Sequence, residues 1–238
     1  MSTEQNQSNN TDGAIVAKGK NFKLVPQGTH LGRCVHMIHI GTIAETYKGN
    51  PRIADKVALI FELPDVKREN PQEGSSPVEL IMKEYTNSLG SKANLRKDIK
   101  SWRGADLTDK EVNEGWDITR LVYGKDREKK SGVAAMISVT HSTTTTGNTY
   151  ANISAIMGVP ASTSVPAQIN PSKVFSYSIK DDKAFVEAFN QVPKFLQEKI
   201  KKSDEWKARE KSISGMLATL PAAQAAPQVQ GSEDDLPF

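Results

Sequence analysis

The chain of 238 residues contains only one cysteine, Cys34, so an internal disulfide cannot form. Such cysteine usage is typical of a reducing compartment, and we expect a cytoplasmic protein. No apolar run approaches the roughly 18 residues of a membrane-spanning helix. The N-terminus also lacks the charged-then-apolar pattern of a secretion signal. We therefore expect no membrane insertion and no export by that route.

Sequence signatures of catalysis and of metal binding are also missing. The chain has no Gly-rich phosphate loop ending in Lys-Ser/Thr, no Gly-X-Ser-X-Gly and no His-Glu-X-X-His. The spacing of Cys34, His36 and His39 resembles a zinc site only superficially. Strand alternation predicts that Cys34 and His36 share one face and that His39 lies on the other. We expect no enzyme, no metal and no cofactor.

Large apolar side chains are scarce at both ends of the chain. The hydrophobic fraction of 37% is low for a fully packed protein, which indicates that part of the chain stays outside the core. We expect a disordered arm over 1–20, a folded domain over 21–180, a helical extension over 181–213, and a flexible linker with an acidic tail over 214–238. The net charge is +3, and the body without its tail acids is more basic, which weakly favours a polyanionic partner.

Alternating apolar residues predict five strands, at 31–47, 56–63, 78–86, 133–141 and 149–157. Gly32 and Gly41 predict a bend or bulge in the long first strand. A helical stretch separates the third strand from the fourth. This order is typical of the five-stranded oligonucleotide-binding (OB) barrel, so we expect a mainly β OB-fold with a helical insertion and a C-terminal helical extension. A generic α+β sheet is the competing architecture.

Local signals define the helices. Ser91 is the expected N-cap of a helix over 92–102, whose apolar stripe includes Trp102, and Gly104 is its expected end. Thr108 and Glu111 fit a capping box. A further helical region spans 181–211, with interruptions expected near Pro193 and Ser203. We expect Trp102 to pack in the core and not to stack on a base.

Cations and flat rings gather in the loops and strands that an OB barrel uses to bind single strands. Cations contact phosphates and aromatic rings stack on bases. Solvated surface charge, or an aromatic residue in the core, is the competing interpretation of each residue. The candidates for binding single-stranded DNA are Tyr47, Lys48 and Arg52 in the first loop; Lys83 and Tyr85 on the third strand; Arg96, Lys100 and Arg103 on the middle helix; and His141 and Tyr150 beside the last hairpin.

The chain ends on Asp234-Asp235-Leu236-Pro237-Phe238, which resembles the tail of bacterial single-stranded-DNA-binding proteins. The resemblance implies that the Phe238 ring enters an apolar pocket on a partner protein, that its carboxylate meets a basic residue, and that Asp234 and Asp235 steer the approach. Leu236 and Pro237 would complete this partner-binding segment. An accidental acidic end is the competing interpretation.

Short stretches of the body resemble phage-encoded single-stranded-DNA-binding proteins of the same barrel class. They are Tyr85–Leu89, Lys92–Arg96, Ser101–Gly104, Asp117 with Leu121, and Tyr150–Ile153, which together cover roughly residues 30–160. The chain departs from the bacterial family in its greater length, its larger middle segment and its helices between barrel and tail. For a phage-encoded protein, the compartment would be the cytoplasm of the bacterial host.

The resemblance implies a protein that coats and protects single-stranded DNA in replication, recombination and repair, and that recruits partner enzymes through its tail. It does not decide whether the protein also forms a homo-oligomer. The alternatives are a recombination mediator or strand-annealing protein, an enzyme of nucleic-acid metabolism with a borrowed tail, and a scaffold that does not bind nucleic acid. We also expect the acidic tip to compete with DNA for the basic surface of the body.

Overall fold

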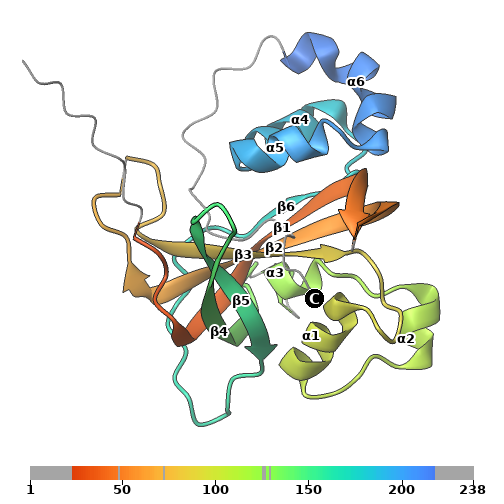
Figure 1. Ribbon diagram of the computed structural model, residues 1–238. Helices are drawn as coiled ribbons and strands as arrows, with labels where there is room; N and C mark the ends of the chain where they lie inside the picture. The colour runs from red at the N-terminus through yellow and green to blue at the C-terminus, as the bar shows by residue number, and fades with distance from the viewer. Residues whose placement is uncertain (1–22, 48, 72, 125–126, 129, 218–238) are drawn as a thin grey trace, which may run out of the picture.

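A long first strand, β1 (Gly28–Tyr47), pairs with three other strands in the computed structural model of the protein (Figure 1). One of its edges pairs antiparallel with β2 (Asn50–Lys67). Its other edge pairs antiparallel with β4 (Ala134–Thr143) and then, at residues 36–38, parallel with β6 (Lys173–Phe175). A strand of this length therefore holds two parts of one sheet together.

The structure describes residues 23–47, 49–71, 73–124, 127–128 and 130–217. They form a mainly β protein with six strands and six helices. The described residues do not include the predicted N-terminal arm or Lys48. They also do not include residues 218–238 of the predicted linker and acidic tail. Within the described part of the chain, none of the helices has both the length and the apolar character needed to cross a membrane.

The sheet has the strand order β3-β2-β1-β4-β5, in which β3 spans Val78–Thr86 and β5 spans Thr149–Met157. Among the described residues, no hydrogen-bonded ladder joins the two outer strands, so the sheet is not closed. Nevertheless, some Cα atoms of β3 and β5 lie within 8 Å of each other. The sheet therefore curls until its edges are close without pairing.

Two irregularities bend β1. The register shifts between His39 and Gly41, which confirms the bulge predicted from Gly41. Gly41 has a φ of +93°, and a Cβ there would lie 2.6 Å from the Glu205 carboxylate, so both backbone conformation and space require glycine. The register does not shift at Gly32. Its lack of a side chain instead lets the neighbouring strands β2 and β4 approach β1 closely. The second bulge falls between Cys34 and His36.

Apolar side chains fill two layers, one on each face of the β1–β3 part of the sheet. On β2, Leu59 and Phe61 point into the first layer, while Ala58 and Ile60 point into the second. The first layer includes Trp102 of α1 (Asn94–Arg103), which lies with α2 (Asp109–Glu114) and α3 (Arg120–Tyr123) on one side. The second layer lies beneath the three C-terminal helices. The helices on both sides therefore bury β2 on both faces, as in sheets whose central strands form continuous apolar runs.

The C-terminal helices are α4 (Asp182–Asn190), α5 (Lys194–Ile200) and α6 (Asp204–Leu217). The breaks between them confirm the predicted interruptions near Pro193 and Ser203. Their aromatic residues pack closely: the rings of Phe189 and Trp206 lie 4.3 Å apart. α6 continues to Leu217, beyond the predicted end of the helical extension at residue 213.

The predictions made from local sequence signals at α1 and α2 were largely correct. Gly104 ends α1 in the left-handed conformation, with φ of 72°, and Thr108 and Glu111 form the expected capping box of α2. The N-cap prediction at Ser91 was wrong. A turn closed by a hydrogen bond from Ala93 N to Gly90 O precedes the helix, so α1 begins at Asn94.

Candidate nucleic-acid interface

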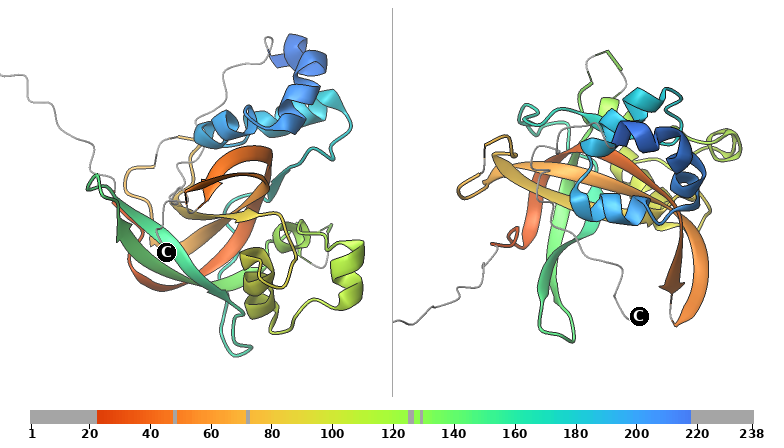
Figure 2. Two further views of the ribbon diagram at one scale, coloured as in Figure 1. Left: turned by 45° about the vertical axis from the view of Figure 1, so that its right-hand side comes forward. Right: turned by 90° about the horizontal axis from the view of Figure 1, so that it is seen from above.

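Two hairpins project beyond the sheet toward the same side of the molecule (Figure 2). We define the β1–β2 hairpin as residues 42–55 and the β4–β5 hairpin as residues 140–152. β3 pairs with β2 only from Lys56 onward, and β1 pairs with β4 only up to Val139. Each hairpin is therefore a two-stranded ribbon, and no third strand among the described residues pairs with it. These ribbons correspond to the loops predicted to contact DNA.

The β4–β5 hairpin contains no Asp, Glu, Lys or Arg. Gly147, with φ of +84°, forms its turn together with hydrogen bonds between Thr144 and Asn148. Side-chain hydroxyls pair across the strands, with 3.0 Å between the Oγ1 atoms of Thr143 and Thr149. Tyr150 is 37% exposed beside this polar strip, and its register partner is Ser142. The hairpin therefore presents one ring and several hydroxyls to solvent.

His141 lies at the base of this hairpin, and it is less exposed to solvent than Tyr150. Its Nε2 atom lies 2.7 Å from the Val25 carbonyl oxygen, and its backbone N–H donates to Gln27 Oε1 at 3.3 Å. These contacts attach β4 to the segment that precedes β1. In this arrangement His141 positions the hairpin.

The β1–β2 hairpin is charged, and its acidic residue Glu45 pairs with two cations. Arg52 Nε donates to Glu45 Oε1 at 2.6 Å, and Lys56 Nζ lies 2.7 Å from Glu45 Oε2. Lys56 is only 2% exposed, whereas 38% of the Arg52 side chain is exposed. Tyr47 ends β1 opposite Asn50, but its side chain lies outside the description. Of the predicted residues here, Arg52 is therefore the one that the structure shows near the surface.

A second carboxylate holds the base of the β1–β2 hairpin. Asp55 Oδ1 lies 2.7 Å from His39 Nε2, and Asp55 Oδ2 accepts from Asn87 Nδ2 at 2.7 Å. Burial raises the pKa of Asp55, but the hydrogen bonds from His39 and Asn87 outweigh this effect and lower it. These contacts link both strands of the hairpin to the loop that follows β3.

On β3, Lys83 and Tyr85 lie on the face opposite to that of Leu80 and Met82, as the alternation predicted. However, the face with Lys83 and Tyr85 is directed toward the interior of the protein. Tyr85 is 3% exposed, and its hydroxyl donates to Asp98 Oδ2 of α1 at 2.8 Å. Lys83 Nζ also lies 2.8 Å from Asp98 Oδ2. Burial, followed by the Asp98 charge, raises the pKa of Tyr85. The interpretation of this face as the outer one was wrong, and Tyr85 offers no ring face for stacking.

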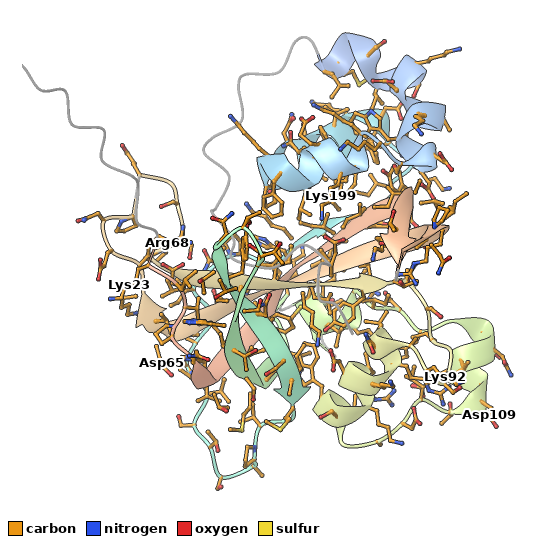
Figure 3. All side chains as sticks on the ribbon, in the orientation of Figure 1. Lys23, Asp65, Arg68, Lys92, Asp109 and Lys199 are labelled. Atoms are coloured by element: carbon orange, nitrogen blue, oxygen red, sulfur yellow. The ribbon has the colours of Figure 1, made fainter. Side chains whose placement is uncertain are left out.

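The outer face of β2 and β3 is covered by the C-terminal helices. Leu80 and Met82 belong to the second apolar layer. Lys199 of α5 donates to Glu84 of β3 at 3.0 Å, and Figure 3 shows Lys199 on the side of α5 that faces the sheet. The sequence carried a signal for this arrangement, because Val57–Phe61 and Leu80–Met82 are unbroken apolar runs. Such runs indicate burial on both faces.

The basic residues of α1 are matched by acidic neighbours. Arg96 and Lys100 contact Asp106 at 2.9 and 3.3 Å, and Arg103 contacts Glu111 at 3.1 Å. Hydrogen bonding from Arg96 is the main cause that lowers the pKa of Asp106 to about 2. The three cations therefore share two carboxylates, which reduces the positive charge of this surface and agrees with the alternative interpretation of a solvated helix face.

Trp102 takes the core position expected of it. Its ring is 6% exposed, and its indole N–H donates to the Ala134 carbonyl oxygen at 2.6 Å.

The side chains of Cys34 and His36 do not share a face of β1, which corrects the prediction made from strand alternation. The bulge between them turns Cys34 into the first layer and His36 to the opposite side. Within the described ranges, no cluster of three or more His, Cys, Asp or Glu is arranged to hold a metal.

Comparisons of the chain with protein-family models, curated proteins and solved structures found no match. The functional argument therefore depends on the geometry of the two hairpins. The β1–β2 hairpin, which contains Arg52, and the β4–β5 hairpin, which contains Tyr150, project toward the same side of the molecule (Figure 2). The structure does not bring Lys83, Tyr85 or the α1 cations to an exposed surface shared with these hairpins.

Proposed function

We propose that the protein binds single-stranded DNA across the side from which the two hairpins project. The observation that carries this proposal is that two ribbons project toward the same side, and that one of them has an exposed aromatic ring and no acidic residue. Single strands bind to surfaces that combine stacking rings with groups that contact phosphates. Duplex DNA would present no unstacked base to Tyr150.

The strand connectivity supports an OB-type barrel as the scaffold. β1 is shared between β2 and β4, the outer strands β3 and β5 approach each other, and α1 lies between the third and fourth strands. This organisation resembles that of a partly open, five-stranded OB barrel, to which β6 and the C-terminal helices would be additions. Such barrels bind oligonucleotides with the face of strands two and three and with the two loops that correspond to these hairpins.

The C-terminal helices change which part of that scaffold is accessible. Because they cover the outer face of β2 and β3, the proposed contacts shift to the hairpins and their margins. Tyr150 would stack on a base, with a contribution of about 1–3 kcal/mol. Hydroxyl groups of the β4–β5 hairpin would donate to phosphate oxygens, which fix the position of the strand without reading its sequence.

The predicted tail, Asp234–Phe238, lies outside the described residues, and its role is part of the same proposal. It would recruit enzymes of replication, recombination and repair while the folded part holds DNA, without catalysis by this chain. Its acids would compete with phosphates for cations. Deletion of residues 233–238 should therefore tighten binding at low salt, and an unchanged affinity would refute the competition.

Fluorescence anisotropy with labelled oligo-dT and a duplex of equal length tests the main proposal. We expect tight binding of the single strand, weak binding of the duplex, and a moderate salt dependence. The dependence should be moderate because the apparent slope for single strands is about −0.7 per neutralised phosphate, and several predicted cations are already paired with acids. Equal affinity for the single strand and the duplex would contradict the proposal.

A further inference from the structure

Side chains from the C-terminal part of the chain continue the outer edge of β1 where strand pairing ends. β6 pairs with this edge only at residues 36–38, and no described strand pairs with it further along. Two side chains take over in order. The Tyr177 hydroxyl lies 3.2 Å from the Ile40 carbonyl oxygen, and Glu205 Oε2 accepts from the Thr42 backbone N–H at 2.7 Å. Backbone groups of the edge are therefore satisfied by side chains up to the start of the β1–β2 hairpin.

Glu205 contacts both polar groups of Thr42. Besides the backbone contact, its Oε1 atom accepts from the Thr42 hydroxyl at 2.7 Å. Burial raises the pKa of Glu205, but the hydrogen bonds from Thr42 outweigh this effect and lower it, so the carboxylate is ionised at pH 7. Two hydrogen bonds to one charged carboxylate fix direction as well as distance. Because Thr42 is the first residue of the hairpin, the carboxylate holds the hairpin at its base.

The position of Glu205 is itself fixed by the core. Glu205 lies in the first turn of α6, and Ser203 Oγ accepts from the Trp206 N–H at 3.2 Å, a contact typical of an N-cap. Ser203 and Trp206 are almost completely buried. The Tyr177 hydroxyl lies 2.7 Å from Ser203 Oγ. The carboxylate is therefore presented by a helix whose start is anchored inside the protein.

The backbone of β1 packs directly against this helix start. A Cβ atom on Gly41 would lie 2.9 Å from Ser203 Cβ and 2.9 Å from Tyr177 Cε2. The other strand of the hairpin is reached through His39. Its ring lies edge-on to Tyr177, with centroids 5.3 Å apart, and its Nε2 atom lies 2.7 Å from Asp55 Oδ1. The contacts therefore extend to both strands at the base of the hairpin.

We propose that Glu205 is a positioning residue, which holds the β1–β2 hairpin in its direction and so fixes the separation of the two hairpins (Figure 2). A two-stranded ribbon is at best marginally stable by itself, so its base must be held from outside. The C-terminal helices then contribute to DNA binding without touching the strand, a role that rests on the proposed function. A preorganised surface loses less conformational freedom on binding and binds more tightly.

Pulsed EPR on the full-length protein measures the separation of the hairpins directly. Spin labels on Thr46→Cys and Thr145→Cys place one label on each hairpin at an exposed position. The native thiol of Cys34 is buried and does not compete for the label. The distance distribution should be narrow in the otherwise unchanged protein and clearly broader with Glu205→Ala. An unchanged distribution with Glu205→Ala would overturn the proposal.

Further variants separate the carboxylate contacts from general effects on α6. Glu205→Gln should keep the narrow distribution, because its amide oxygen accepts from the Thr42 N–H and its amide nitrogen donates to the Thr42 hydroxyl. Glu210→Ala, an exposed change on the same helix that removes the same charge, is the matched control. Equal broadening in Glu210→Ala would refute the role of Glu205. If Glu205→Ala does not fold, Thr42→Val replaces it and should broaden the distribution less, whereas no broadening there would refute the proposal as well.

Anisotropy with oligo-dT separates the positioning role from the proposed function. Glu205→Ala should bind about threefold more weakly than the wild type, and Glu205→Gln should bind as the wild type does. A broadened distribution with unchanged affinity would overturn the role of Glu205 in DNA binding. If oligo-dT binds but the distribution does not change, the positioning proposal fails while DNA binding stands. If the wild type does not bind oligo-dT, the proposed function fails, and the distance distribution alone decides whether Glu205 holds the hairpin.

Discussion

The two hairpins differ in how their polar groups are satisfied. The β1–β2 hairpin contains acids and cations that pair with one another, and its charges stabilise the ribbon. The β4–β5 hairpin contains no charged residue, and its hydroxyls hydrogen-bond locally beside an exposed ring. Charge in a loop therefore does not by itself indicate a surface that is free to bind a ligand. The described charges of the first hairpin stabilise its own fold, whereas the second hairpin leaves one ring and several hydroxyl groups exposed to solvent.

The largest expected effect is on stability, from Glu45→Gln in the β1–β2 hairpin. This change removes the carboxylate from Arg52 and from the buried Lys56. Removal of one partner from a buried ion pair costs about 3–5 kcal/mol. Urea unfolding should show a loss near the lower limit. Glu69→Gln is the matched control, because its pair with Lys23 is 68% exposed on both sides and the change should cost less than about 0.5 kcal/mol.

The next largest effect should fall on DNA affinity, from Tyr150→Ala in the β4–β5 hairpin. Loss of one stacking ring should weaken oligo-dT binding by about 1–3 kcal/mol, while thermal stability stays nearly constant because the ring is partly exposed. Tyr150→Phe keeps the ring and should bind almost as well as the wild type. Anisotropy titrations measure the difference, and equal affinity of the alanine variant would remove the β4–β5 hairpin from the interface.

A smaller effect concerns pH and the base of the β1–β2 hairpin. The pKa of Asp55 is lower in the folded state, so its contribution to stability is present above the ordinary pKa of aspartate and is lost as the pH falls through the folded value. Solvent screening limits this contribution to below about 1 kcal/mol. The urea midpoint should fall less between pH 7 and pH 3 in Asp55→Asn than in the wild type. Identical pH profiles would show that Asp55 does not stabilise the hairpin.

The smallest effect should come from Arg52→Gln. Glu45 already pairs with this guanidinium, so the loss of oligo-dT affinity should be less than about threefold and the salt slope should change little. Anisotropy at several salt concentrations measures both quantities. A slope change of about 0.7 would show that Arg52 contacts a phosphate. In that case the β1–β2 hairpin would contribute more to DNA binding than the comparison of the two hairpins predicts.

Much of the local structure was predictable. β3 and β5 have the bounds that alternation predicted, and the capping box at Thr108 and the breaks between the C-terminal helices follow short-range signals. These features depend on steric contacts and hydrogen bonds within a few residues. The start of α1 was missed because an unforeseen turn at Gly90–Ala93 competes with the cap at Ser91.

The candidate site was less predictable than the strands. Lys83 and Tyr85 were correctly assigned to one face of β3, but the direction of that face depends on which side α1 covers. Arg96, Lys100 and Arg103 were identified as cations, but their acidic partners lie 6 to 10 residues away and meet them only in the folded chain. Tyr150 was predicted to lie beside a hairpin, and the structure shows it exposed there.

The sequence by itself determined the central parts of the five predicted strands, the capping box of α2, the helix breaks and the uncharged composition of the β4–β5 hairpin, because these depend on residues close together in the chain. Only the tertiary structure decided that the C-terminal helices cover β2 and β3 and that Glu45 pairs with two cations. It also decided, through one bulge, that His36 faces Lys173 and not the side of Cys34. Burial and charge pairing depend on contacts between distant segments, and one extra residue in a strand reverses the face of every residue that follows it.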